Sequence, residues 1–298
     1  MAAGFFDGVH RGHLKVLSAT IASAQKRNGE AWALSFDRHP LEILQPGSEP
    51  ELITSKPHKK ALLEKIGMDG CVFMRFTRRL AEMEPGNFAR ALKDSAPSLS
   101  GVFIGQNWRF GRGGKGSPSD LSRFGRKLGF DVSIIRPATV DGKPVSSTRI
   151  RKLVAGGRLQ KASRLLGRPV GVLGKVVKGR GIGRRLGFPT ANMDPYDELL
   201  PPTGVYAVSA SMKNRLFDGV LNLGIRPTYI GETAVPLPEL HLLDVETELY
   251  GKTIEVFFIE KIRSERRFKS EEELKRSIAR DAEKAKTILR ENKLKKNS

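Results

Sequence analysis

Cysteine, aromatic residues and acidic residues are all scarce in this 298-residue chain. A single cysteine, Cys71, excludes an intrachain disulfide framework and is compatible with a reducing compartment. No stretch approaches the ~18 uninterrupted apolar residues of a membrane span, and residues 1–13 lack the apolar core of a secretion signal. These absences predict a soluble, cytoplasmic protein without a membrane partner.

The shortage of acidic residues leaves a large positive charge. Lys and Arg number 52 against 32 Asp and Glu, so the formal net charge is +20. Such a charge attracts nucleic acids, anionic membranes or phosphorylated small molecules. The basic residues are scattered, and the sequence contains no RNP motif, zinc finger or helix-turn-helix pattern. We therefore expect small phosphorylated ligands and no specific nucleic acid. A nucleic-acid-binding protein remains the alternative class.

The length suggests two domains, at roughly 150 residues each, and the pattern changes near residue 166. Before it, strand-like and helix-like segments alternate, which predicts an α/β domain with a parallel, Rossmann-like sheet and ligands at the carboxyl ends of its strands. The predicted boundaries are domains at 1–165 and 166–298. The expected strands are 31–36, 70–73, 101–105 and 131–135, and the expected helices are 14–24, 59–66, 88–92 and 121–128.

The second half contains short β-branched or apolar segments separated by Gly, Pro and Asn. This pattern predicts an antiparallel barrel or sandwich. Ser270 and Glu273 resemble a capping box that opens a final amphipathic helix with an apolar face from Leu274 to Leu289. The expected strands are 170–177, 204–211, 219–223, 239–245 and 254–259.

The segment Gly4–His13, GFFDGVHRGH, carries the strongest local signal. A strand, a glycine-marked turn and a helix N-terminus together form an anion site, because the first helical amides lack internal partners. His10 and His13 lie one turn apart and can face the same phosphates, and Gly12 leaves room for a nucleotide. A zinc pair is the alternative, but no Cys cluster or HExxH supplies further ligands.

This segment resembles the nucleotidyltransferase signature of bacterial FAD synthetases. Ser146–Arg151, SSTRIR, is similar to the second signature of that family, and Phe36–Pro40 and Gly105–Gly111 are similar to two segments between them. Arg38 stands where the family usually has proline, and the first strand is very short. The resemblance implies transfer of AMP from ATP to FMN, which forms FAD and releases pyrophosphate.

The same resemblance implies a role for each matching residue. His10 and His13 would steady the α- and β-phosphates during catalysis. For Asn107, Arg109 and Phe110, an ordinary loop at a strand end is nearly as good an explanation as flavin binding. The implied ATP-binding residues are Phe6, Asp7, Gly8, Gly12, Ser146, Ser147, Thr148 and Arg151, and the implied flavin-binding residues are Asn107, Arg109 and Phe110.

A longer signature runs from Gly174 to Asn192 and includes the string GFPTAN. Its glycines permit a flap whose amides can wrap a phosphate. Thr190 and Asn192 offer hard oxygen ligands for Mg²⁺ and a triphosphate. The glycines alone would indicate only a Gly-rich hairpin with a basic surface. The complete string closely resembles the riboflavin kinase motif, and Pro202–Tyr206, Asn222–Thr228 and Glu239–Asp244 match that family in order.

The kinase resemblance implies a Greek-key β-barrel that transfers the γ-phosphoryl group of ATP to riboflavin. Glu239 would be the general base, Thr190 and Asn192 would bind Mg²⁺-ATP, and His241 would pack. Gly179, Gly181, Gly187 and Pro189 would line the ATP site. The chain is thus expected to be a bifunctional flavin-cofactor enzyme, a monomer or weak oligomer, whose partners are riboflavin, FMN, FAD and ATP. A chain with kinase activity alone is the remaining alternative.

Overall fold

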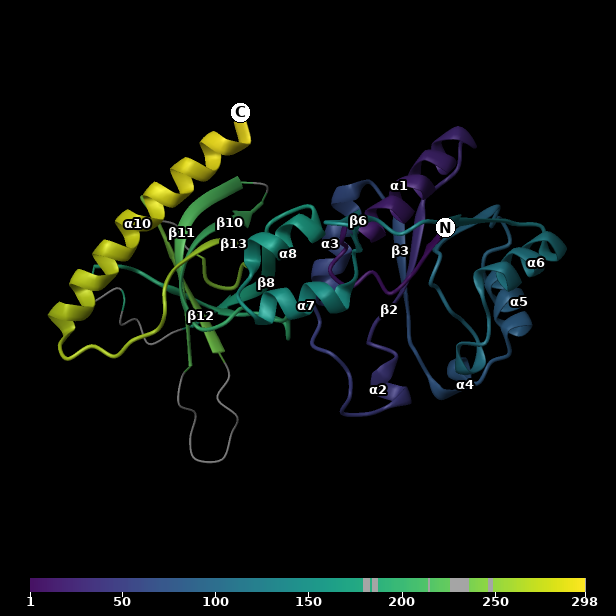
Figure 1. The fold of residues 1–298 in the computed structure, drawn as a ribbon, viewed down its shortest axis with the longest axis horizontal. Coiled ribbons are helices and arrows are strands. Elements are labelled where there is room, and N and C mark those ends of the chain that lie inside the picture. Colours follow the sequence, from purple (N-terminus) through teal and green to yellow (C-terminus); the bar gives the residue numbers. More distant parts are fainter. Residues whose placement is uncertain (179–182, 184–186, 214, 226–235, 246–248, 298) are drawn as a thin grey trace. The chain divides into compact units, whose positions relative to one another are not determined.

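A computed structural model describes residues 1–178, 183, 187–213, 215–225, 236–245 and 249–297 (Figure 1). The chain divides into two compact units, Met1–Ser147 and Thr148–Ser298. The sequence instead predicts a boundary at residue 165, which stays a prediction. Within the described ranges, no helix is long and apolar enough to cross a membrane.

The first unit is built on a five-stranded parallel sheet with the order β3-β2-β1-β4-β5. The predicted parallel sheet is therefore confirmed. The first strand has only two residues, yet it lies at the centre, because Ala2 pairs with Ala33 on one side and Phe103 on the other. The strands are β1 (Ala2–Ala3), β2 (Trp32–Phe36), β3 (Gly70–Met74), β4 (Gly101–Gly105) and β5 (Asp131–Ile135).

Helices cover both faces of this sheet. Ala2 packs in the apolar cluster formed with α1 and α3, whereas Ala3 packs in the cluster formed with α5 and α6. Successive strand residues point to opposite faces, so two adjacent alanines serve both cores. The helices are α1 (Arg11–Lys26), α2 (Leu41–Leu44), α3 (Lys56–Ile66), α4 (Arg78–Ala81), α5 (Pro85–Ser95) and α6 (Pro118–Leu128), with a short η1 (Arg112–Gly114) and a hairpin of β6 (Thr139–Val140) and β7 (Lys143–Pro144).

The strand order determines where the first unit can hold a ligand. β1 lies between β2 and β4. The chain continues from β1 to β2 on one side of the sheet, and from β4 to β5 on the other side. Ligands of such open sheets bind at this reversal, outside the carboxyl ends of the strands. The segments at those ends begin at Gly4, Asp37 and Gln106, directly after β1, β2 and β4.

The second unit is a closed barrel with the order β10-β11-β12-β9-β8-β13. Its pairings are all antiparallel, so the β-barrel that the kinase resemblance implies is confirmed, and the sandwich that periodicity also allowed is excluded. The elements are α7 (Ser147–Ala155), α8 (Leu159–Leu166), β8 (Val170–Val177), β9 (Ala191–Asp194), β10 (Gly204–Met212), β11 (Arg215–Ile225), β12 (Pro236–Leu242) and β13 (Thr253–Arg263).

One strand lies three residues earlier than predicted. The sequence suggests 239–245, whereas β12 ends at Leu242. The reason is local, since Asp244 adopts a left-handed conformation with φ 53°, and the Leu243 amide bonds the Asp218 carbonyl at 2.9 Å. A residue with positive φ ends an extended strand.

The last helix, α10 (Glu271–Asn297), packs on the outside of the barrel. Its Ala282, Ala285 and Leu289 pack against a patch of barrel residues, which confirms the predicted apolar face over the second half of its predicted range. Ser270 accepts a hydrogen bond from the Glu273 amide at 3.2 Å, as predicted, while the Glu273 carboxylate accepts from the Lys269 amide rather than closing a full capping box. The patch consists of the strand residues Val205, Ala207, Val220 and Ile259, together with Leu243, which directly follows β12.

Candidate active sites

His10 closes the amino end of α1. Its Nδ1 accepts hydrogen bonds from the Gly12 amide at 3.1 Å and the His13 amide at 3.3 Å. A neutral imidazole that accepts at Nδ1 carries its proton on Nε2. The His13 ring stacks on His10 with centroids 3.5 Å apart and 14° between the planes. The structure therefore brings both predicted imidazoles together at a helix N-terminus.

The loop before α1 has a strained backbone. Phe6, Gly8 and Val9 all have positive φ, at 53°, 78° and 37°. Glycine adopts this region freely, but a phenylalanine or a β-branched valine does not. Each such residue costs on the order of 1–3 kcal/mol and persists only where the surroundings impose it. A Cβ added to Gly8 would also lie 3.1 Å from the Ile53 side chain.

Asp7 provides much of that constraint. Its carboxylate is 1% exposed and accepts hydrogen bonds from the amides of Ile53 and Thr54, each at 3.0 Å. The Gly8 amide in turn donates to Thr54 Oγ1 at 2.9 Å. These contacts fasten the loop after β1 to the segment that precedes α3. The described contacts of Asp7 hold the loop, and its predicted contact with ATP stays a prediction.

The two nucleotidyltransferase signatures meet at Asp7. Ser147 Oγ donates a hydrogen bond of 2.9 Å to the Asp7 carbonyl oxygen, across 140 residues of chain. The Val145 carbonyl would lie 3.8 Å from a Cβ placed on Gly12. Ser146 is exposed beside them, while Thr148 and Arg151 belong to the second unit. The predicted contacts of these four residues with ATP stay predictions.

Lys59 was missed by the sequence analysis. It is 2% exposed, and its Nζ lies 4.1 Å from the centroid of the Phe5 ring. Desolvation by burial lowers the pKa of Lys59 to about 8, against an opposing effect of the Asp7 charge. A sequence signal was present, because Lys59 precedes Leu62 and Leu63 by three and four residues. A lysine on the apolar stripe of a helix is unusual.

The three residues predicted on the flavin side have different environments. Asn107 and Arg109 are exposed after β4. Phe110 is 6% exposed and packs in the core, with its ring 4.9 Å from Trp108 and 5.4 Å from Phe88. Its described contacts are therefore those of a packing residue. Flavin contact by all three stays a prediction.

The segment after β2 also reaches the first loop. The His39 ring lies edge-on to Phe5 with centroids 4.8 Å apart, and His39 Nδ1 accepts from the Leu41 amide at the start of α2. Arg38, which replaces the usual proline, is exposed and pairs with Glu42 at 3.5 Å. The substitution therefore leaves His39 against the signature loop.

In the second unit, Glu239 lies between two asparagines. It is the register partner of Asn192 on β9 and of Asn222 on β11. The neighbouring Leu240 is fully buried inside the barrel, so Glu239 projects from the opposite face of β12. The structure thus joins the predicted base to a predicted metal ligand. Asn222 belongs to a string that matches the kinase family, and the sequence alone does not indicate that it lies opposite Glu239.

His241 contacts the two residues that precede Thr190. Its Nδ1 lies 2.8 Å from the Pro189 carbonyl oxygen, and its ring meets Phe188 edge-on. His241 thus makes one polar and one ring contact with this segment, and its predicted packing role stays a prediction. A Cβ on Gly183 would lie 2.8 Å from Thr190 Oγ1, so this glycine permits a close approach. Gly187 has φ 86°, and Gly179, Gly181 and Arg226–Thr228 lie outside the described residues.

The side-chain oxygens near Glu239 are suitable ligands for a magnesium ion. Thr190 is exposed and Asn192 is 5% exposed, and they offer a hydroxyl and an amide oxygen. Such oxygens are hard ligands that Mg²⁺ accepts alongside phosphates and water. Within the part of the chain that the structure describes, no group of three or more His, Cys, Asp or Glu residues could hold a metal. A magnesium ion here would therefore depend largely on ATP oxygens.

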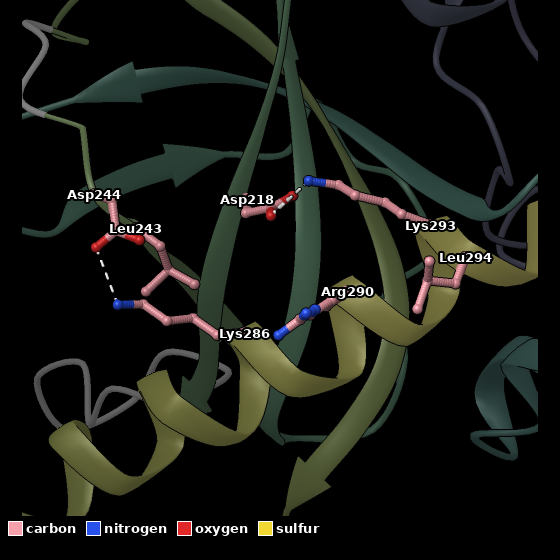
Figure 2. Close-up of a pocket in the computed structure, with 7 residues that line it drawn as sticks. All are labelled: Asp218, Leu243, Asp244, Lys286, Arg290, Lys293 and Leu294. Carbon is pink, nitrogen blue, oxygen red and sulfur yellow. Dashed lines mark hydrogen bonds and ion pairs between the residues drawn. The ribbon is translucent and has the colours of Figure 1, made fainter. Parts of the chain in front are cut away.

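Among the cavities of the described residues, two lie as follows, away from the residues above. One of about 240 Å³ lies beneath α10, where Lys286 bonds Asp244 at 3.0 Å and Lys293 bonds Asp218 at 2.8 Å (Figure 2). The other, of about 850 Å³, is lined by residues of the first unit that include Trp32. Neither contains a predicted site residue.

Comparison with known proteins gives matches in both units. The FAD synthetase family matches residues 1–149, and the riboflavin kinase family matches residues 166–289. The bifunctional riboflavin kinase/FMN adenylyltransferase of Escherichia coli K12 is 37% identical over 282 residues, covering 94% of this chain and 90% of that protein. The protein of the same name from Haemophilus influenzae is 35% identical over 290 residues, covering 97% and 94%.

A solved structure extends the likeness to the fold. A protein from Streptococcus pneumoniae, described as a macrolide-efflux protein, superposes with a TM-score of 0.81 at 26% identity, covering 96% of this chain and 93% of that one. A shared fold does not transfer an activity, so its description is not carried to this chain. The two family matches and the relatives agree with both signatures. The chain belongs to the family of bifunctional riboflavin kinase/FMN adenylyltransferases.

Proposed function

We propose that this chain makes FAD from riboflavin in two ATP-dependent steps, one in each unit. The kinase step forms FMN and the adenylyltransferase step consumes it. The proposal rests on one observation. In each unit, residues that match the family but lie far apart in the sequence are close together in the structure. Ser147 bonds Asp7 in the first unit, and Glu239 pairs with Asn192 in the second.

In the adenylyltransferase step, a phosphate oxygen of FMN attacks the α-phosphorus of ATP, and pyrophosphate leaves. No protein nucleophile is needed, because positioning and charge stabilisation supply most of the catalysis. His10 donates from Nε2 to the phosphates, and His13, stacked on it, acts from the same side. Phe6, Gly8 and Gly12 line the phosphate path, and Ser146, Ser147, Thr148 and Arg151 hold the triphosphate. Asn107, Arg109 and Phe110 form the flavin side.

In the kinase step, the 5′-hydroxyl of riboflavin attacks the γ-phosphorus of ATP, and ADP leaves. Glu239 accepts the hydroxyl proton as the general base. Thr190 and Asn192 hold Mg²⁺, which neutralises charge on the phosphates when bound. Gly179, Gly181, Gly187 and Pro189 enclose the triphosphate. Asn222, the register partner of Glu239 on β11, helps orient its carboxylate.

The proposal also covers the domain boundary, the location of the enzyme in the cell, its oligomeric state and its partners. We place the domain boundary at residue 165 and the enzyme in the cytoplasm, as a monomer or weak oligomer. Its basic surface serves anionic ATP, FMN and FAD, without a specific nucleic acid or a membrane.

The test is a time course with riboflavin, ATP and Mg²⁺, in which FMN and FAD are separated by chromatography. FMN should appear first and FAD after it, and both should need ATP. Incidental RNA binding should weaken steeply with salt. Tight, salt-resistant RNA binding without flavin turnover would replace this proposal with the nucleic-acid alternative. FMN without FAD would leave only the kinase.

A further inference from the structure

Lys59 is a buried cation that neither proposed reaction uses. It belongs to the first turn of α3 and is 2% exposed. Its Nζ lies 4.1 Å from the Phe5 ring centroid and 6.0 Å from that of Phe73. Both distances fall within the range of attraction between a cation and an aromatic face. An ammonium is thus held in a nearly dry position beside the first signature.

The charged and titratable groups described around Lys59 come from α3 and from the loops after β1 and β2. From the loop after β1, Asp7 interacts electrostatically with Lys59. From α3 itself, Lys56 Nζ lies 5.4 Å from the Phe73 ring, although Lys56 is exposed. From the loop after β2, His39 contacts Phe5 by its ring edge. Asp7 is thus the charged group that acts on Lys59, while Lys56 shares the Phe73 ring with it.

The position of Lys59 is costly for stability alone. Burying an ammonium is unfavourable unless it is paired, and Lys59 occupies the apolar stripe that continues through Leu62 and Leu63. A leucine or methionine would satisfy that stripe. A charge retained there needs a function, and the groups that compensate it are two members of the signature loop, Phe5 and Asp7.

These two residues belong to the strained loop or border it. Phe6 lies between them with φ 53°, and Gly8 and Val9 follow with positive φ before His10 caps α1. Asp7 also carries the hydrogen bonds to Ile53, Thr54 and Ser147. A change in charge at Lys59 therefore acts on the segment that places His10.

We propose that Lys59 is a positioning residue for adenylyl transfer: its charged ammonium, held on Phe5 and facing buried Asp7, keeps the loop in the conformation that presents His10 to the ATP phosphates. This inference rests on the proposed function of the first unit. Loss of the charge leaves Asp7 uncompensated and releases the strained loop. A misplacement of about 1 Å can cost about 100-fold in rate.

The proposal makes activity and stability respond to pH in opposite directions. The pKa of Lys59 is about 8 in the folded chain, below its ordinary value of 10.5. FAD formation from FMN should fall as pH rises through about 8, because Lys59 becomes neutral. Between this pKa and 10.5 the unfolded chain binds more protons, so the contribution of Lys59 to stability rises with pH. A purely structural lysine would not separate these two readouts.

The experiment measures FMN-to-FAD conversion by the full chain from pH 6 to pH 10, with riboflavin kinase activity as an internal reference. Lys59→Met should lower kcat about 10-fold to 100-fold at pH 7, with smaller changes in the KM values, and should remove the alkaline decline. Lys59→Arg keeps its charge throughout this range and should restore most of the rate without that decline.

The matched control is Lys60→Met, next in the same helix. Lys60 is exposed and pairs only weakly with Glu64, at 3.6 Å. This variant should keep the rate within about twofold and retain the wild-type alkaline decline. The free energies of unfolding of the wild type and of Lys59→Met are compared at pH 7 and pH 9.5. The wild type should gain stability relative to the variant at the higher pH.

A wild-type FAD-forming rate that shows no decline through pH 8 relative to the kinase reaction would overturn the role of Lys59, even if Lys59→Met did not fold. The same conclusion follows if Lys59→Met lowers both activities equally. Absence of FAD at every pH would instead overturn the proposed function of the first unit, and the inference with it.

Discussion

Ser147 Oγ donates a 2.9 Å hydrogen bond to the Asp7 carbonyl oxygen and joins two signatures that lie 140 residues apart. The acceptor lies next to Phe6 and Gly8, whose φ values are positive. The bond therefore acts on the most constrained part of the first unit.

The first prediction concerns this hydrogen bond. Ser147→Ala should lower FAD formation from FMN about 10-fold, while costing only about 1 kcal/mol of stability, because one hydrogen bond is lost. Steady-state kinetics and urea unfolding would measure both. Ser147→Thr keeps the hydroxyl and should retain more of the rate than the alanine variant. Equal activity of the serine and alanine enzymes would show that the bond does not position the loop.

The second prediction separates the two tasks of His10. Asparagine is a strong N-cap and alanine is a weak one, so His10→Ala should be about 1 kcal/mol less stable than His10→Asn. Both variants lack the imidazole and should lose FAD formation alike, with riboflavin phosphorylation retained. Thermal unfolding and the two assays would test this.

A double variant extends that test to both imidazoles. His10→Ala combined with His13→Ala should abolish FAD formation from FMN while FMN formation continues. FAD formation at the parent rate would mean that the role assigned to the first signature is wrong.

The third prediction concerns the general base. Glu239→Gln keeps the shape of the side chain between Asn192 and Asn222 but cannot accept the riboflavin proton, so FMN formation should fall about 100-fold or more. Conversion of supplied FMN to FAD should be unchanged. Asp244→Asn is the matched control, since Asp244 is an exposed turn residue paired with Lys286, and asparagine tolerates its positive φ. Equal loss of both activities in Glu239→Gln would argue against separate sites.

The fourth prediction concerns the anchor of α10. Arg263 bonds Asp281 with Nε at 2.9 Å and with its terminal nitrogen at 2.8 Å, and the Asp281 side chain is 7% exposed. Asp281→Ala leaves a largely buried guanidinium without its carboxylate and should cost about 3–5 kcal/mol of stability. Urea unfolding followed by far-ultraviolet circular dichroism would measure it.

A surface ion pair on the same helix provides the control for that prediction. Lys286 pairs with the exposed Asp244, and Lys286→Met should leave the free energy of unfolding almost unchanged. A cost for Asp281→Ala as small as that of the control would mean that the buried pair does not anchor α10.

Local pattern was sufficient for most of the secondary structure. Residues 101–105 and 131–135 form the expected strands, and the helix expected around residues 14–24 becomes α1, because hydrophobic periodicity records which face of an element is buried. The prediction for β12 was three residues out of place. Its end depends on the turn conformation of Asp244 and on a hydrogen bond from the Leu243 amide to the distant Asp218 carbonyl.

The features of the two sites also divide into those that the local sequence indicates and those that need the tertiary structure. The amino-acid sequence by itself determined the alternation of strands and helices, the two signatures, and the pairing of His10 with His13, since all of these depend on neighbours within a few residues. The kinase resemblance already implied the barrel, but only the tertiary structure decided that Ser147 meets Asp7, that Asn222 adjoins Glu239 and that Lys59 is buried against Phe5. The physical reason is that burial and pairing depend on contacts between distant segments, which local pattern does not encode.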